Sequence, residues 1–220
     1  MSAGAWEIKE RKKVLVGILH TDVVTLAWAF GLRNLIIPGD ICPIAGMPFD
    51  HARNHLVQTM MQGGYEYVFF LDSDVIPGSD AILRLLSRNE PFISGLYSRR
   101  SPPHSIPVAI KNGQWVTNYV PGSVIEVDKV GAGCLLISRK FFESIPPQRP
   151  GYPWFDWRVN FQGTPGLDSE YCQSEDFTLC SHARAHGFRV MLDTSVVCRH
   201  CGYAQATHGQ FVPMETIPNT

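Results

Sequence analysis

Short apolar runs alternate with segments of helical periodicity along the first half of the chain. Two short apolar runs have the length and composition of strands buried on both faces, residues 14–19 and 67–71, and a third strand is predicted at residues 92–97. Helices are predicted between them at residues 25–32, 50–62 and 79–88. A further short strand is predicted near residues 34–37, followed by a loop rich in Gly and Pro up to residue 48. This alternation indicates a parallel sheet with helices on its faces.

The pattern changes in the second half. Lys111, Asn112 and Gly113 form a strong hairpin signal, so antiparallel pairing is expected around it. Further strands are predicted at residues 124–127, 130–138, 189–192 and 196–200. A loop without periodicity spans residues 145–169, and a helix is predicted from Ser174 to Gly187. The fold class is therefore α/β, with a mixed, mainly parallel, Rossmann-like sheet flanked by helices.

Length and composition indicate one globular domain. The 220 residues are 45% hydrophobic and 18% charged, which suits a single domain over residues 1–220, with a core at about 13–202 and a tail at about 203–220. The net charge of -1 gives no overall attraction to nucleic acid or anionic membranes. No apolar run is long enough to span a membrane, and the first 13 residues are polar and charged, so a cytoplasmic location is expected. The six cysteines are expected to be thiols.

Two carboxylates follow directly after the apolar run at residues 67–71. They are Asp72 and Asp74, with Ser73 between them. Ligands of open α/β sheets bind beyond the carboxyl ends of the strands, and residues two apart on extended chain project the same way. Carboxylates held together suit Mg²⁺ or Mn²⁺, which also take substrate phosphates as ligands. A solvated acidic turn is the alternative, but the position after a buried strand favours a metal and diphosphate site.

A second acidic pair, Glu175 and Asp176, begins the late predicted helix. The helix dipole alone accounts for acids in a first turn, although the same geometry can aim a carboxylate into a cleft as a general base. His200 ends an apolar run, where a structural role competes with that of a third metal ligand. Trp154, Phe155 and Trp157 fall in the long loop, where they either stack on a sugar ring or cover the core.

These motifs, in this order and spacing, resemble those of GT-A-fold glycosyltransferases, particularly the small bacterial and phage-type members of the family-two-like group. The resemblance covers residues 14–202. It rests on the acidic triplet, the preceding Arg53 and Asn54, the segment 131–134, Trp154 with Phe155, the acidic pair and His200.

The resemblance implies a role for each matching residue. Asp74 and His200 would bind Mn²⁺ or Mg²⁺, and Asp72 would contact the metal's water shell or the donor ribose. Asp176 would be the general base of an inverting reaction, or Glu175 and Asp176 would position a substrate under retention. The remaining roles are nucleotide binding, the sugar pocket and the acceptor site: Thr21, Asp22 and Arg53 for the first, Gly131, Ala132 and Gly133 for the second, and Trp154 and Phe155 for the third.

The expected activity is metal-dependent transfer of a sugar, a hexose in the first instance, from a nucleotide-diphosphate sugar to an acceptor hydroxyl. A UDP-sugar is the favoured donor, and the acceptor is a glycan, a small molecule or modified DNA. Two other classes compete with this hypothesis. A sugar-nucleotide nucleotidyltransferase usually has a Gly-rich basic loop after its first strand, whereas this chain has His20, Thr21 and Asp22 there. A non-catalytic module binding glycans or nucleic acid is the other, with a basic patch at Arg99, Arg100, Lys111 and Arg149.

Overall fold

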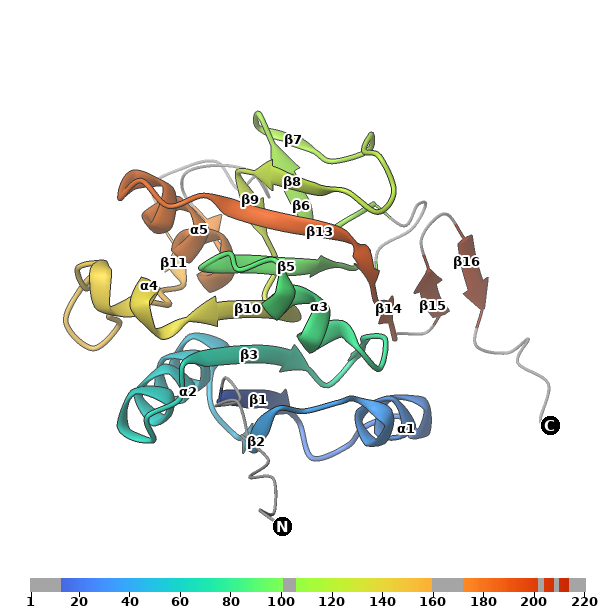
Figure 1. Cartoon of the computed structure of the whole chain (residues 1–220), viewed down its shortest axis with the longest axis horizontal. Coiled ribbons are helices and arrows are strands. Elements are labelled where there is room, and N and C mark those ends of the chain that lie inside the picture. Colours follow the sequence, from blue (N-terminus) through green and yellow to red (C-terminus); the bar gives the residue numbers. More distant parts are fainter. Residues whose placement is uncertain (1–12, 101–105, 160–171, 202–203, 208–209, 214–220) are drawn as a thin grey trace, which may run out of the picture.

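A seven-stranded sheet forms the centre of the protein in a computed structural model, which describes residues 13–100, 106–159, 172–201, 204–207 and 210–213. Five strands run parallel, while β10 and β8 run antiparallel to their neighbours (Figure 1). In spatial order the strands are β2 (Gly39–Ala45), β1 (Val14–His20), β3 (Tyr67–Asp72), β10 (Cys134–Ser138), β5 (Phe92–Leu96), β13 (Val190–Val197) and β8 (Val124–Val127). The predicted mixed, mainly parallel α/β architecture is confirmed.

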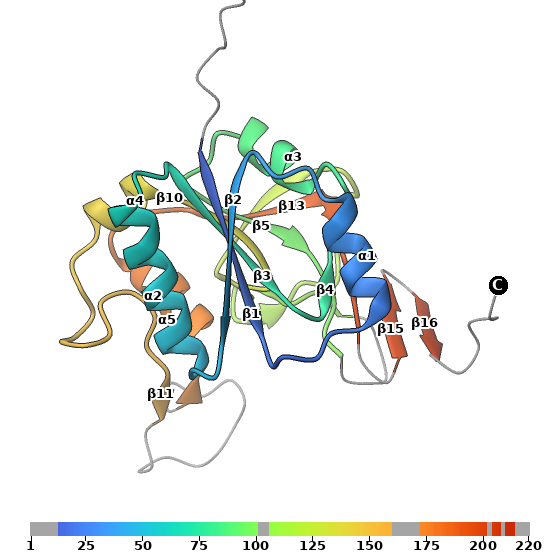
Figure 2. The same cartoon turned by 90° about the horizontal axis from the view of Figure 1, so that it is seen from below.

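Helices cover both faces of this sheet (Figure 2). On one face lie α2 (Phe49–Gln62), α4 (Arg139–Ser144) and α5 (Glu175–Ala185), and on the other lie α1 (Leu26–Asn34) and α3 (Ala81–Ser87). Successive residues of a strand point to opposite faces, so β3 sends Val68 and Phe70 into the first core and Phe69 and Leu71 into the second. Burial on both faces explains why β1, β3 and β5 are mainly apolar along their whole length.

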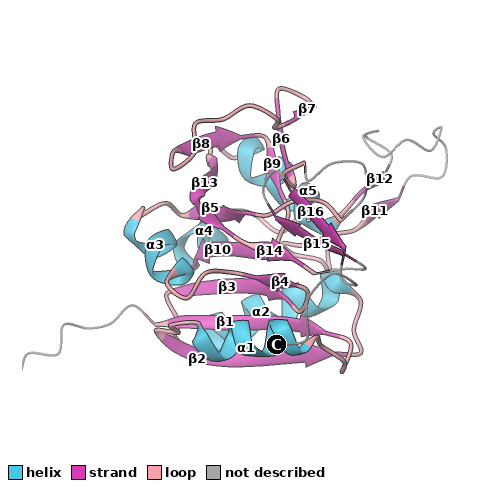
Figure 3. Cartoon of the chain, turned by 90° about the vertical axis from the view of Figure 1, so that its right-hand side faces the viewer, coloured by secondary structure: helices cyan, strands magenta, loops and turns pink. Residues whose placement is uncertain are grey.

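Three small sheets surround the carboxyl ends of the central strands. Figure 3 shows the first beside β3, and it contains β4 (Val75–Ile76), β14 (Arg199–His200), β15 (Ala204–Thr207) and β16 (Gln210–Pro213). The second joins β7 (Gln114–Trp115), β6 (Ala109–Lys111) and β9 (Lys129–Val130), and the third pairs β11 (Arg158–Val159) with β12 (Cys172–Gln173). Because β14 pairs with β4, His200 lies opposite Val75 and next to the acidic triplet, about 125 residues away in the chain.

Several predicted elements differ from the structure. The strand predicted at residues 34–37 is wrong, since α1 runs to Asn34, and a strand missed from the sequence, β2, occupies Gly39–Ala45. β2 is an edge strand whose side chains are mostly exposed, so it has no apolar run, and an edge tolerates Pro43. The strand predicted at residues 130–138 is divided by Gly131–Gly133 into β9 and β10.

The C-terminal part also differs from the prediction. The two strands predicted at residues 189–192 and 196–200 are the single strand β13, with an irregular register between Asp193 and Val197, followed by β14. Within the predicted tail, residues 204–207 and 210–213 form a pair of strands, and the rest of the tail lies outside the described residues.

Other local predictions hold. Asn112 and Gly113 both have positive φ, as a two-residue hairpin turn requires. The helix predicted from Ser174 is α5, and the part of the predicted loop from residue 160 to 169 lies outside the described residues. The five cysteines whose side chains the structure describes are thiols: Cys42, Cys134, Cys180, Cys198 and Cys201. Within the described residues, no helix has the length and apolar character needed to cross a membrane.

Candidate functional site

The acidic triplet lies at the carboxyl end of β3 and makes contacts on both sides. Asp72 ends the strand, and its Oδ1 accepts a hydrogen bond from Nη2 of Arg53 at 2.9 Å. Its backbone carbonyl accepts a hydrogen bond from the buried indole of Trp28 at 3.1 Å. Ser73 donates its backbone N–H to the carbonyl of Leu19 at 3.2 Å, which ties the triplet to the end of β1. The triplet is therefore fixed to the ends of two parallel strands.

Asp74 faces His200. Oδ1 of Asp74 lies 3.5 Å from Nε2 of His200, and Oδ2 lies 2.9 Å from Nη1 of Arg100, whose side chain is 58% exposed. Burial raises the pKa of Asp74, but the hydrogen bond and charge of a protonated His200 ring and the charge of Arg100 outweigh it, so the net shift is downward. The Asp74 carboxylate is thus ionised at neutral pH.

The protonation of His200 follows from its second hydrogen bond. Nδ1 lies 2.6 Å from the carbonyl oxygen of Ser98, and because a carbonyl can only accept, Nδ1 carries a proton. In the neutral ring, Nε2 then presents its lone pair toward the Asp74 carboxylate. Two lone-pair donors facing each other repel unless a cation lies between them, or unless the ring is protonated. A hydrogen bond from Nδ1–H to a backbone carbonyl, as His200 makes to Ser98, is a common way in which proteins orient a histidine whose Nε2 binds a metal.

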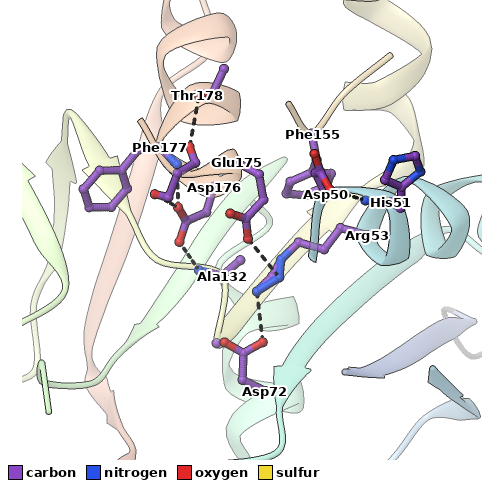
Figure 4. A network of polar contacts seen from close by, with 12 residues as sticks. Asp50, His51, Arg53, Asp72, Ala132, Phe155, Glu175, Asp176, Phe177 and Thr178 are labelled. Atoms are coloured by element: carbon purple, nitrogen blue, oxygen red, sulfur yellow. Dashed lines mark hydrogen bonds and ion pairs between the residues drawn. The ribbon is translucent and has the colours of Figure 1, made fainter. Parts of the chain in front are cut away.

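Arg53 joins the two acidic pairs, as Figure 4 shows. It lies on α2 and is only 2% exposed, with Nη2 bound to Asp72 and Nη1 3.5 Å from Oε1 of Glu175. Nε and Nη1 of Arg53 have no hydrogen-bond partner among the described residues. The resemblance implies that this guanidinium contacts the base or the diphosphate of the donor, which stays a prediction. Its burial between two carboxylates shows that it also holds the two ends of the site together.

Glu175 is the buried acid of the second pair. Glu175 is the first residue of α5, and its side chain is 5% exposed. Burial raises the pKa of Glu175 to about 7, against the opposing charge of Arg53 and with the help of neighbouring Asp176. Burial likewise raises the pKa of Asp72, with Asp74 and Asp176 adding to the shift and Arg53 and His200 opposing it. The site therefore concentrates negative charge in a partly dry environment.

This raised pKa predicts that the protein loses stability as the pH rises. Between the ordinary value of 4.5 and about 7, folded Glu175 keeps a proton that the unfolded chain has released, so stability falls through this range and levels off above it. At about 1.4 kcal/mol per pKa unit, the loss is roughly 3 kcal/mol. Urea denaturation at about pH 5 and about pH 8 measures it. The wild type should lose roughly that much more stability than Glu175→Gln, and an equal loss in both proteins would contradict the assignment.

Asp176 points toward the loop between β9 and β10 (Figure 4). Its Oδ2 accepts the backbone N–H of Ala132 at 3.3 Å, while Oδ1 accepts the N–H of Phe177 at 2.8 Å and the hydroxyl of Ser174. The carboxylate is half-buried and held by a fixed set of donors. These contacts orient it with respect to the Gly131–Gly133 segment.

Tyr97 explains the small residues of that segment and was missed from the sequence. A Cβ on Gly131 would lie 2.1 Å from the Tyr97 hydroxyl, and Gly133 donates its N–H to the same hydroxyl at 2.9 Å. The ring of Tyr97 also packs edge-on against His200, with 5.4 Å between centroids. The sugar pocket implied by the resemblance stays a prediction, and the structure shows that the small residues accommodate the closely packed Tyr97. Within the apolar run at residues 92–97, a tyrosine looks like part of the core.

The two predicted acceptor residues differ in exposure. The Phe155 side chain is fully buried and packs edge-on against Phe70, so its ring covers the core, which was one of the two roles considered for the aromatics of this loop, and a contribution of Phe155 to an acceptor site stays a prediction. Trp154 is half-buried and packs against Phe142. Asn54 fixes this loop, because its Oδ1 accepts the backbone N–H groups of both Trp154 and Phe155 at 3.1 Å. The Arg53 and Asn54 pair thus contacts both the carboxylates and the loop.

Thr21 and Asp22 follow the end of β1 and are exposed. Asp22 has a φ of 66°, and its backbone N–H donates to Nδ1 of His20 at 3.1 Å. Among the described residues, no ion pair joins Thr21 or Asp22 to Asp74 or Glu175, so their nucleotide contact stays a prediction. Within the described part of the chain, no three His, Cys, Asp or Glu side chains converge as a complete metal site. Asp74 and His200 are the pair that the fold brings together.

Two solved structures share the architecture of this chain. No protein-family model matches the chain, and no curated protein is significantly similar to it. Among solved structures, GalNAc-T7 with UDP, GalNAc and Mn²⁺ matches 87% of this chain with a TM-score of 0.52 and 11% identity. The chain has the GT-A fold. It spans only 44% of the GalNAc-T7 chain. The crystal structure of A197 from STIV matches 91% of this GT-A chain and 93% of its own, with a TM-score of 0.65 and 17% identity.

Proposed function

We propose that this protein is a metal-dependent glycosyltransferase that moves a sugar from a nucleoside-diphosphate sugar to an acceptor hydroxyl. The observation that carries the proposal is the pairing of Asp74 with Nε2 of His200 at 3.5 Å, directly beyond a parallel strand of a GT-A sheet. The GT-A fold and the Asp74–His200 pair are separate observations, and both support this activity. A UDP-sugar is the favoured donor, since GalNAc-T7, which has this fold, was solved with UDP and Mn²⁺.

The residues present fit a divalent cation. Asp74 and His200 would hold Mn²⁺ or Mg²⁺, because a carboxylate and an imidazole whose other nitrogen is hydrogen-bonded are ordinary ligands of such ions. When bound, the ion supplies positive charge that stabilises a departing diphosphate. Asp72, held by Arg53, lies beside this pair and is placed to meet the metal's water shell or a donor ribose.

Asp176 is the proposed general base. Its carboxylate is fixed by the N–H groups of Ala132 and Phe177, so it is presented in one orientation. In that role it accepts the proton of the acceptor hydroxyl as the hydroxyl oxygen attacks the anomeric carbon and the bond to the diphosphate breaks. Glu175, buried beside it and facing Arg53, keeps that guanidinium in place rather than contacting the acceptor. This chemistry inverts the anomeric centre.

The direct test is turnover with and without metal. Purified protein is incubated with UDP-glucose and Mn²⁺, and released UDP is measured in parallel with samples in excess chelator. We expect hydrolysis or transfer only when the metal is present. Full activity in chelator would sink the metal-dependent proposal, and binding of UDP-sugars without any release would favour a non-catalytic module.

Asp176→Asn is expected to separate chemistry from donor binding. The amide keeps the size of the side chain but cannot take a proton, so kcat should fall by roughly a hundredfold to ten-thousandfold. The Kd for UDP with Mn²⁺, measured by calorimetry, should stay within about twofold, because the hydrogen bonds of the Asp176 carboxylate go to Ala132, Ser174 and Phe177 and not to Asp74 or His200. Transfer at the normal rate, or a product that keeps the donor's anomeric configuration, would show that Asp176 is not the base.

A further inference from the structure

Four side chains form a continuous row on the surface beside the site. Arg99 lies over the ring of Trp115 at 4.4 Å from the centroid, and Trp115 lies 6.3 Å from the ring of Phe177. Nζ of Lys129 lies 5.6 Å from the centroid of Phe177. The order is therefore cation, aromatic, aromatic, cation, and we call this row the aromatic ladder. All four side chains are half-buried, so each keeps part of its surface accessible.

Two members of the aromatic ladder, Arg99 and Phe177, are neighbours in the chain of residues in the proposed site. Arg99 lies between Ser98, whose carbonyl accepts the hydrogen bond of His200, and Arg100, which contacts Asp74. Phe177, which lies beside Lys129 in the row, follows Asp176 at the start of α5. The aromatic ladder is therefore tied through its backbone both to the Asp74 and His200 pair and to the proposed base.

Within the described part of the chain, no acidic side chain pairs with the two cations of the aromatic ladder. Neither Arg99 nor Lys129 has a carboxylate partner among the residues that the structure describes. By contrast, eight other described arginines contact acids: Arg53, Arg84, Arg88, Arg100, Arg139, Arg149, Arg184 and Arg189. Two cations that rest only on aromatic faces remain available to an anion, since a cation–π contact leaves most of their donors unused.

We propose that the aromatic ladder is an acceptor subsite for an anionic glycan. This inference rests on the proposed glycosyltransferase function and names the class of acceptor for it. The apolar face of a pyranose ring stacks on Trp115 or Phe177, and a carboxylate, phosphate or sulfate on the glycan binds Arg99 or Lys129. A nucleic-acid acceptor fits less well, because it needs a track of free cations along its backbone. Two members of the basic patch predicted from the sequence are occupied, Arg100 by Asp74 and Arg149 by Asp156.

The test is binding of the full chain to immobilised glycans that carry uronic acid, phosphate or sulfate, alongside their neutral parents and a single-stranded oligonucleotide. We expect at least one anionic glycan to bind about tenfold more tightly than its neutral parent. Arg99→Ala should remove this preference, and Trp115→Ala should weaken binding of charged and neutral forms alike by about tenfold. The kind of anion that binds distinguishes carboxylate, phosphate and sulfate sources.

Matched controls and a second readout separate the possible failures. Arg33→Ala and Phe30→Ala remove an exposed cation and an exposed aromatic from α1, and both should bind like the wild type. Thermal melting confirms that each variant is folded, and UDP binding with Mn²⁺ tests the donor site separately. Intact donor binding with no preference for anionic glycans, or a preference unchanged in Arg99→Ala, overturns the acceptor subsite alone. Binding of the oligonucleotide but of no glycan overturns it in favour of nucleic acid, whereas loss of donor binding in the wild type refutes the proposed function itself.

Discussion

Asp74→Ala is expected to reduce metal-dependent turnover by roughly a thousandfold. The variant removes a carboxylate ligand of the divalent cation that would stabilise the departing diphosphate. The side chain projects from the turn after β3 and contacts His200 and the exposed Arg100, so its removal leaves the core intact. Turnover of UDP-glucose at saturating Mn²⁺ gives the activity, and urea denaturation gives the stability. The variant should unfold close to the wild-type midpoint.

Asp80→Ala provides the matched control. Asp80 is also an aspartate just beyond β3 and β4, and it also pairs with an arginine, Arg84, but both side chains are about half exposed. The same chemical change there should leave turnover within about twofold of the wild type, because an exposed ion pair carries little energy and the residue lies outside the site. Activity retained in Asp74→Ala, or lost equally in Asp80→Ala, would refute the assignment of Asp74.

Arg53→Met should destabilise the protein by about 3 to 5 kcal/mol, the usual result of removing one partner from a buried ion pair. Methionine keeps much of the aliphatic volume, but Asp72 and Glu175 lose the cation between them. The loss should be smaller at about pH 5 than at about pH 8, because without Arg53 the buried carboxyl groups take up protons in the folded state. Urea denaturation at the two pH values measures both effects.

Two further variants test the cause of that loss. Adding Glu175→Gln to Arg53→Met should restore part of the stability, because it removes one of the two unpaired charges. Arg84→Met removes an exposed arginine from its pair with Asp80 and should leave the urea midpoint unchanged within error. A pH-independent loss, or a double variant no more stable than Arg53→Met, would show that Arg53 acts through packing rather than charge.

The sequence predicted the elements that are buried on both faces. β1, β3 and β5 appear as apolar runs because α2 and α3 cover opposite faces of the sheet that contains them. β2 was missed because an edge strand has exposed side chains and no such run. The break between β9 and β10 was missed for a different reason, since Val130 and Cys134 continue the apolar pattern on both sides of the glycines.

Less of the site's geometry could be predicted, because it depends on contacts between distant parts of the chain. Strand ends and helix starts in the sequence drew attention to Asp72, Asp74, Glu175 and Asp176. No local pattern indicates that Arg53 is buried between two of these acids, or that Ser98 fixes the proton on His200. Phe155 shows the converse problem, since an aromatic residue in a predicted loop suggested exposure, whereas Asn54 holds its backbone and the ring joins the core.

The central claim is that Asp74 and His200 bind a divalent cation together with the diphosphate of the donor. Electron paramagnetic resonance of Mn²⁺ tests it most directly, with free and bound ion measured as UDP is added to the wild type and to His200→Ala. We expect UDP to increase Mn²⁺ binding to the wild type, and we expect His200→Ala to weaken this binding at least tenfold. Equal Mn²⁺ binding by both proteins, or UDP binding that is unchanged by chelator, would contradict it.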